Sequence, residues 1–344
     1  MTDRKDFDTI MHEITSGLTG DDRKDIEYLN GQIEKYKEHE LKQEIIRACA
    51  RLIYQRLPED KKDEFARILR NQTSGTEAAL EEVRFNIYKK DYERALQIIE
   101  ALAEKVESMN AFQDDQVSEY HVFNEWFEEV LYRFREKPAK DLRQAQIPFT
   151  SIYGLYGSLL VEMKRYTEAR EVLKKGLKWN PISFDLTSEY IETFKMTGDL
   201  EEFYILSRDA FKIAFHPNDV ARCYRNIGFY FVERELYQEA IGCFLMSMEF
   251  QKDSKEAQSE LYYISTKTNG KVKEPTLKQM QKIAAKYGFP MGADDDILGL
   301  AVTYGRHFME RNDPESARYF LTIAYDLTSN EQLGEMIHKL PAGE

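Results

Sequence analysis

Hydrophobic residues recur along most of the chain at spacings of three and four, the period of one face of an α-helix. In the clearest stretch, two such stripes follow each other. The first comprises Tyr224, Ile227, Gly228 and Phe231, and the second Tyr237, Ala240 and Phe244. Small residues at Gly228 and Ala240 let two antiparallel helices approach closely, with residues 233–236 turning the chain between them. We expect Gly228 to face Ala240.

The same frame returns elsewhere in the chain. In the clear copies a Gly precedes an Ala by 12 residues, at Gly157 and Ala169 and at Gly305 and Ala317, and a weaker copy has Val83 and Ala95. The four anchor alanines, Ala95, Ala169, Ala240 and Ala317, lie 74, 71 and 77 residues apart. Amphipathic segments fill the gaps at residues 122–134, 190–211 and 261–287. We therefore expect one degenerate helix pair in each gap.

These residues resemble the tetratricopeptide repeat, whose pattern is W-x2-L-G-x2-Y, then A-x3-F, then P, with a period of about 34. The anchor spacing is close to twice that period. The resemblance implies an all-α fold, a right-handed α-α superhelix of about seven helix pairs over residues 76–340. Each pair would cover the apolar face of its neighbour. More than 70% of the residues should be helical, and no sheet is expected.

Residues 1–70 lack this frame but keep the helical spacing, which predicts a small N-terminal helical cap or bundle. The polar run at residues 71–76 is the best linker candidate in the chain. We place the boundary between the bundle and the repeat array there.

Composition narrows the classes of function. Among 344 residues, 61 are acidic and 48 basic, a formal charge of −13 that argues against binding nucleic acid. The charged N-terminus and the lack of an apolar run of about 20 residues argue against secretion and against a membrane span. The three cysteines have no close pair, which favours a reducing compartment. A cytoplasmic protein is expected.

Signals for catalysis are weak. Residues 21–25 read D-D-x-x-D, which holds magnesium in terpenoid synthases, but they follow Gly20 at a predicted helix start, where acidic residues are favoured. The three aspartates at 294–296 likewise precede a helix and lack the Gly and Glu of a calcium loop. We predict capping at both places, no metal site, no cofactor and no enzyme activity.

One basic segment interrupts the acidic chain. It carries Lys267, Lys271, Lys273, Lys278, Lys282 and Lys286 against the single acid Glu274. A solvated helix face is the simpler interpretation, and a site for an acidic partner is the alternative.

The face beside the packing stripe predicts a binding groove. In arrays resembling this one, that face accepts peptides, and the offsets from Tyr224 select a set of candidate residues. They are Arg222, Arg225, Asn226, Phe229, Ser188, Glu192, Tyr263 and Arg306. Arg222, Arg225 and Asn226 could hold a carboxylate, much as basic and Asn residues do in some family members. Alternatively, the arginines pair with Asp185, Glu192 or Glu256.

The function expected from this resemblance is a non-enzymatic scaffold or adaptor that binds a protein or peptide in its groove. The alternative is a peptide-sensing regulator similar to the Rap-type proteins of Gram-positive bacteria, which sequester or modulate a signalling partner. The domain order fits that alternative, a helical bundle followed by a repeat array. No residue motif supports it.

Overall fold

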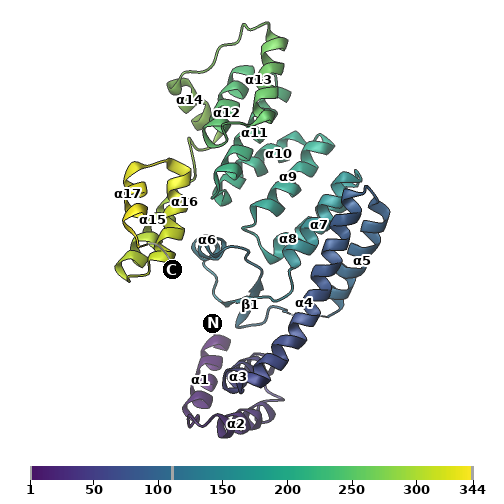
Figure 1. Cartoon of the computed structure of the whole chain (residues 1–344), viewed down its shortest axis with the longest axis vertical. Helices are drawn as coiled ribbons and strands as arrows, with labels where there is room; N and C mark the ends of the chain where they lie inside the picture. Colours follow the sequence, from purple (N-terminus) through teal and green to yellow (C-terminus); the bar gives the residue numbers. More distant parts are fainter. Residues whose placement is uncertain (1, 110–111, 342–344) are drawn as a thin grey trace. The chain divides into compact units, whose positions relative to one another are not determined.

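A computed structural model describes residues 2–109 and 112–341 and is 74% helical, with 17 α-helices in these residues and almost no sheet (Figure 1). The all-α prediction is confirmed. The chain forms two compact units. The first runs to Phe123 and adds Glu136–Leu159 and Lys178–Asn180, and the second comprises Asn124–Arg135, Leu160–Leu177 and the chain from Pro181.

The first unit begins with three helices that share one core. They are α1 (Thr2–Ser16), α2 (Asp22–Lys35) and α3 (Lys42–Arg56). One residue from each helix, Ile14, Leu29 and Ile45, is almost completely buried in this core. These helices lie in the segment for which the helical spacing predicts an N-terminal cap or bundle, and its status as a separate domain stays a prediction.

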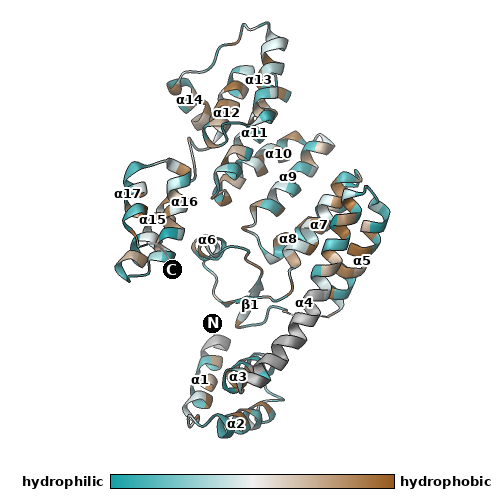
Figure 2. Ribbon diagram, in the orientation of Figure 1, coloured by the Kyte–Doolittle hydropathy of each residue, from teal (hydrophilic) through white to brown (hydrophobic). Residues whose placement is uncertain are grey.

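The next two helices, α4 (Glu59–Tyr88) and α5 (Tyr92–Ser108), form a pair. Helix α5 buries one face, which includes Ala95, Ile99 and Leu102, and it is hydrophilic on the other (Figure 2). Residues 71–76, the predicted linker, are helical and belong to α4. The domain boundary at this segment stays a prediction.

The first gap between repeats departs from the expected helix pair. It holds one helix, α6 (Trp126–Glu136), and two short parallel strands, β1 (Ser118–His121) and β2 (Asp141–Gln144), paired with Ser118 opposite Asp141. The prediction of no sheet is wrong at these residues. The Asp115 carboxylate accepts the backbone N–H groups of Val117 and Ser118. Such local bonds offer the backbone an alternative to a helix, and β1 follows directly.

From residue 149 onward, the chain is a succession of helices, beginning with α7 (Phe149–Glu162) and α8 (Tyr166–Trp179). In the second unit, α9 (Phe184–Thr197) pairs with α10 (Leu200–Asp209), α11 (Pro217–Glu233) with α12 (Tyr237–Phe250), and α15 (Asp295–Glu310) with α16 (Pro314–Thr328). Between them, α13 (Lys255–Thr268) and α14 (Leu277–Tyr287) both contact α12. A 3₁₀ turn, η1 (Ala210–Ile213), follows α10, and α17 (Glu331–Lys339) follows α16. The sequence suggested about seven helix pairs, and the described residues depart from this pattern after α12, because α14 contacts α12.

The turn inside a pair has a recurring geometry. A residue with positive φ stands five positions before each anchor alanine, at Lys90, Lys164, Glu235 and Asn312, with φ between 56° and 61°. The N–H of the next residue then donates to the carbonyl five positions earlier, as Leu236 does to Phe231 at 2.8 Å. These bonds satisfy carbonyls that the helix end leaves free. The expected turn at 233–236 is confirmed.

The glycines of the repeated frame make room for bulky residues. A Cβ placed on Gly228 would lie 2.9 Å from the Phe244 ring, and one on Gly305 would lie 2.6 Å from the Leu321 side chain. The residues that crowd these glycines therefore stand 16 positions later. That these glycines also face the alanines 12 positions later stays a prediction.

In the second unit, α6 packs against helices far from it in sequence. The Trp126 ring centroid lies 4.7 Å from that of Phe320 and 5.2 Å from that of Phe308. The Phe127 N–H donates to the Tyr319 hydroxyl at 3.1 Å. Helix α6 thus covers apolar surface of the α15–α16 pair.

Candidate functional site

Three first helices of consecutive pairs, α9, α11 and α13, contribute most of the lining of a cavity of about 270 Å³. Its lining residues are Glu192, Lys195, Arg222, Arg225, Asn226, Phe229, Phe244, Glu256 and Glu260. All of them lie in the second unit. We call this cavity the α11 pocket, because α11 supplies four of the residues. It brings together five of the eight predicted groove residues: Arg222, Arg225, Asn226, Phe229 and Glu192.

The hydrogen bonds of the two arginines differ from the pairings considered above. The Arg222 guanidinium lies 3.6 Å from the carboxylate of Glu189 on α9. Arg225 donates to the neutral side-chain oxygen of Gln251 at 2.6 Å. In the described part of the chain, no carboxylate lies within ion-pair distance of Arg225. Its charge is therefore balanced only at longer range, by Glu256.

The remaining charges of the α11 pocket are arranged in pairs. Glu192 lies 3.6 Å from the ammonium of Lys195, which also stands 4.5 Å from the centroid of the Phe229 ring. Glu256 accepts a hydrogen bond from the Ser254 hydroxyl at 2.9 Å. Both cations and carboxylates thus line the pocket, which suits a ligand that carries both kinds of group.

The pKa values of three groups are shifted here, two of them by burial. Burial lowers the pKa of Arg225 and raises the pKa of Glu260, which Lys195 opposes. Hydrogen bonds from its own backbone N–H and from Ser254 lower the pKa of Glu256. A half-buried guanidinium such as Arg225 gains more from a carboxylate ligand than an exposed one would, because less water competes for it.

Three predicted groove residues lie outside the α11 pocket. Ser188 is 2% exposed, and its hydroxyl donates to the Asp185 carbonyl, so it belongs to the packed face of α9. Tyr263 on α13 and Arg306 on α15 are exposed but do not line the pocket. The offset taken from α11 therefore selects lining residues only in part on α9, where Glu192 lines the pocket and Ser188 does not.

Sequence reasoning missed three lining residues, Lys195, Phe244 and Glu260. Two of them carried a signal. Lys195 follows Glu192 by three positions, which places both on one helix face. Phe244 stands 16 positions after Gly228, whose missing side chain leaves room for its ring.

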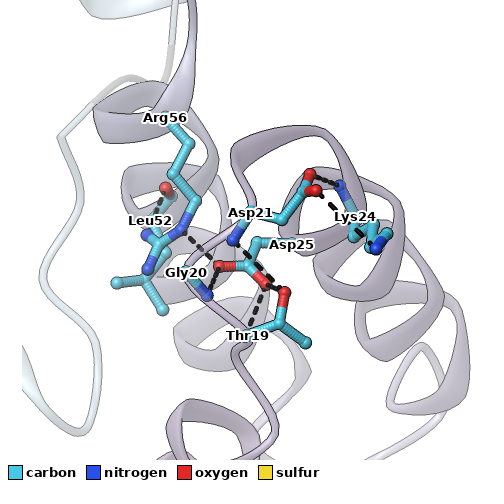
Figure 3. A network of polar contacts seen from close by, with 7 residues as sticks. All are labelled: Thr19, Gly20, Asp21, Lys24, Asp25, Leu52 and Arg56. Atoms are coloured by element: carbon cyan, nitrogen blue, oxygen red, sulfur yellow. Dashed lines mark hydrogen bonds and ion pairs between the residues drawn. The ribbon is translucent and has the colours of Figure 1, made fainter.

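The D-D-x-x-D motif has a structural role (Figure 3). Asp21 caps α2 by accepting the Lys24 N–H, and Asp25 is fully buried. The Asp25 carboxylate accepts the backbone N–H groups of Thr19 and Gly20, the Thr19 hydroxyl and the Arg56 guanidinium, at 2.7 to 3.3 Å. The backbone bond from Thr19 is the largest cause that lowers the pKa of Asp25. Because these hydrogen bonds occupy the lone pairs of its carboxylate, Asp25 serves to link α2 to α3.

Asp294 is likewise a cap. It accepts the N–H groups of Asp296 and Ile297 at the start of α15 and pairs with Arg135 of α6 at 3.0 Å. Across residues 2–109 and 112–341, no group of three or more His, Cys, Asp or Glu side chains is arranged to hold a metal ion. None of the described helices combines the length and the apolar content that crossing a bilayer requires.

Comparison with known proteins identifies one repeat directly. Residues 150–183, most of α7 and all of α8, match the family model described as tetratricopeptide repeat. Among curated proteins, no significant match is found. The chain is similar to the solved structure of PilF of Pseudomonas aeruginosa, with 11% identity and a TM-score of 0.41. That match covers 78% of this chain and 98% of PilF. A second similar structure is YrrB, described as a TPR protein with an unusual peptide-binding site, with 14% identity and a TM-score of 0.30 over 62% of this chain and 100% of YrrB.

Proposed function

Because the chain carries a tetratricopeptide repeat among helix pairs of similar frame, we propose that it is a non-enzymatic scaffold that binds a polypeptide in the α11 pocket. In this proposal Arg225 holds a carboxylate of the peptide, either a side chain or the C-terminus. Arg222 and Asn226 add donors, and Phe229 contacts an apolar group. The observation that supports it most is Arg225, a half-buried cation that lines a cavity and bonds only a neutral side chain.

Glu256 and Glu260 refine the expected ligand. They line the same pocket, so a strongly acidic peptide would meet repulsion there. A peptide with one carboxylate and a nearby cation matches the charges better. The pocket is also small, about 270 Å³, which corresponds to a few side chains of an extended peptide.

The test uses a peptide library with free C-termini and an amidated twin library, both screened against the intact chain. A peptide selected in this way is then titrated against Arg225→Ala. Loss of a charge-assisted hydrogen bond should weaken binding by about 1.5–3 kcal/mol, roughly 10- to 150-fold. Folding should change little, because Gln251 keeps access to water.

Arg306→Ala is the matched control. It removes the same side chain from another first helix, at a position outside the α11 pocket. Affinity should stay at the native level for this variant. If Arg225→Ala lowers the melting temperature but leaves affinity unchanged, Arg225 serves the scaffold and the proposal fails.

A second candidate is the Rap-type peptide sensor. The three-helix bundle α1–α3 at the start of the chain favours it, since a separate N-terminal module would be available to contact a signalling partner. Binding of a peptide in the α11 pocket would then change the partner affinity of residues 1–56. Hydrogen exchange of the bundle with and without a bound peptide distinguishes this sensor from a simple scaffold, for which no change is expected.

A further inference from the structure

A second cavity, of about 530 Å³, lies on α12, α13 and the loop before α14, and it shares no residue with the α11 pocket. Its lining residues are Ile241, Leu261, Ile264, Ser265, Thr268, Gly270, Val272, Lys273 and Glu274. We call it the loop pocket. Its apolar floor includes Ile241 and Ile264, which are 7% and 1% exposed. Because this floor is buried, a ligand would reach it only with an apolar group that protrudes into the pocket.

The loop that forms one wall is fixed to α12. The Gln238 side-chain amide donates to the carbonyl of Lys273 at 3.3 Å. Pro275 and Met280 pack so closely on Gly242 that an added Cβ would lie 2.9 Å and 2.5 Å from their side chains. The wall is thus held by packing as well as by a hydrogen bond, and the pocket has a defined shape.

The rim of the loop pocket is basic in a chain of net charge −13. Lys273 lines it, and Lys271 lies in the loop between the lining residues Gly270 and Val272. Both are exposed, and within the described residues neither has an ion-pair partner. The single acid of the lining, Glu274, cannot balance them. Charges left without partners around an apolar floor are complementary to an acidic ligand.

We propose that the loop pocket docks an acidic peptide segment that inserts one apolar side chain between α12, α13 and the loop. Carboxylates on either side of that anchor meet Lys271 and Lys273. Tyr262 and Leu277, which are 76% and 68% exposed, stand on the bordering helices where a bound segment can cover them. The recessed floor favours a peptide over a membrane surface, since a bilayer has no protruding group of this kind.

The test uses a fluorescent synthetic peptide with glutamates flanking a central leucine, and a twin with glutamine at every glutamate. The acidic peptide should bind the native chain, and the twin should bind at least about tenfold more weakly. Lys271→Glu with Lys273→Glu should cause a similar loss. The matched control is Lys252→Glu with Lys255→Glu, the same charge change beside the opposite end of α13, which should leave binding intact.

Three outcomes would overturn this inference: equal binding of both peptides, equal loss in both double variants, or binding of phosphatidylserine vesicles without binding of the acidic peptide. The native chain could instead self-associate in a way that the Lys271 and Lys273 variants abolish. That result would assign the loop pocket to a second copy of the chain and would also reject the inference. Arg225→Ala should not change binding of this peptide, which separates the two pockets.

Discussion

Replacement of Gly228 by alanine tests the close contact between α11 and α12. The new Cβ would lie 2.9 Å from two atoms of the Phe244 ring, against an ordinary contact of 3.4–4 Å. The ring is 1% exposed, so it cannot turn into solvent. A clash of this kind in a packed core costs about 1–3 kcal/mol.

A second effect opposes the clash. Alanine is more favourable than glycine inside a helix by about 1 kcal/mol. The net change for Gly228→Ala should therefore be a destabilisation of roughly 0–2 kcal/mol. Gly299→Ala isolates the second effect, because Gly299 lies within α15 and an added Cβ would meet nothing within 4 Å. That variant should gain up to about 1 kcal/mol.

The measured quantity is the difference between these two variants in free energy of unfolding, followed by far-UV circular dichroism in heat and in denaturant. It should be about 1–3 kcal/mol, with Gly228→Ala the less stable. Phe244→Leu should reduce the cost of Gly228→Ala, because it removes the ring that clashes. If the two alanine variants have equal stability, the contact between Gly228 and Phe244 does not limit the packing and the reasoning is refuted.

Two further predictions concern buried carboxylates. Asp25→Asn should lower the melting temperature at neutral pH, whereas the exposed Asp22→Asn in the same helix turn should not. Because folding lowers the pKa of Asp25, the contribution of Asp25 to stability should vanish as pH falls through that lowered value. Burial raises the pKa of Asp219 from 3.8 to about 6, so the folded state binds this proton more tightly and stability should fall as pH rises between those values. Asp219→Asn should remove about 1–2 kcal/mol of that fall in stability, a figure reduced for solvent screening. Thermal melts at a series of pH values measure it, and an unchanged pH profile would contradict the prediction.

Local sequence determined the helices and their pairing. Tyr224, Ile227 and Phe231 define one face of α11 by the 100° step per residue, and this step also places Arg222, Arg225 and Phe229 correctly around the α11 pocket. Within a single helix, the direction of every side chain follows from the residues that face inward. For that reason the spacing within one regular helix was enough to group these residues on one face, and their binding role stays a prediction.

Contacts between helices decided the rest of the candidate site. On α9, Glu192 lines the pocket, but Ser188 is buried by neighbouring elements that no spacing within α9 reveals. The same holds for α13, where Glu256 and Glu260 line the pocket and Tyr263 does not. These pairs lack the Gly and Ala of the frame, so the sequence gives no reference point for their rotation.

Backbone geometry at the turns and in the first gap also depended on the folded chain. Lys90, Lys164 and Glu235 adopt a positive φ that non-glycine residues rarely take, so residue type did not predict this backbone conformation. The turn is held by its hydrogen bonds and by the two helices that it joins. Likewise, the pairing of β1 with β2 joins residues more than 20 positions apart. The periodicity of the sequence thus determined which segments are helical, and only tertiary packing decided how each helix is turned toward its neighbours.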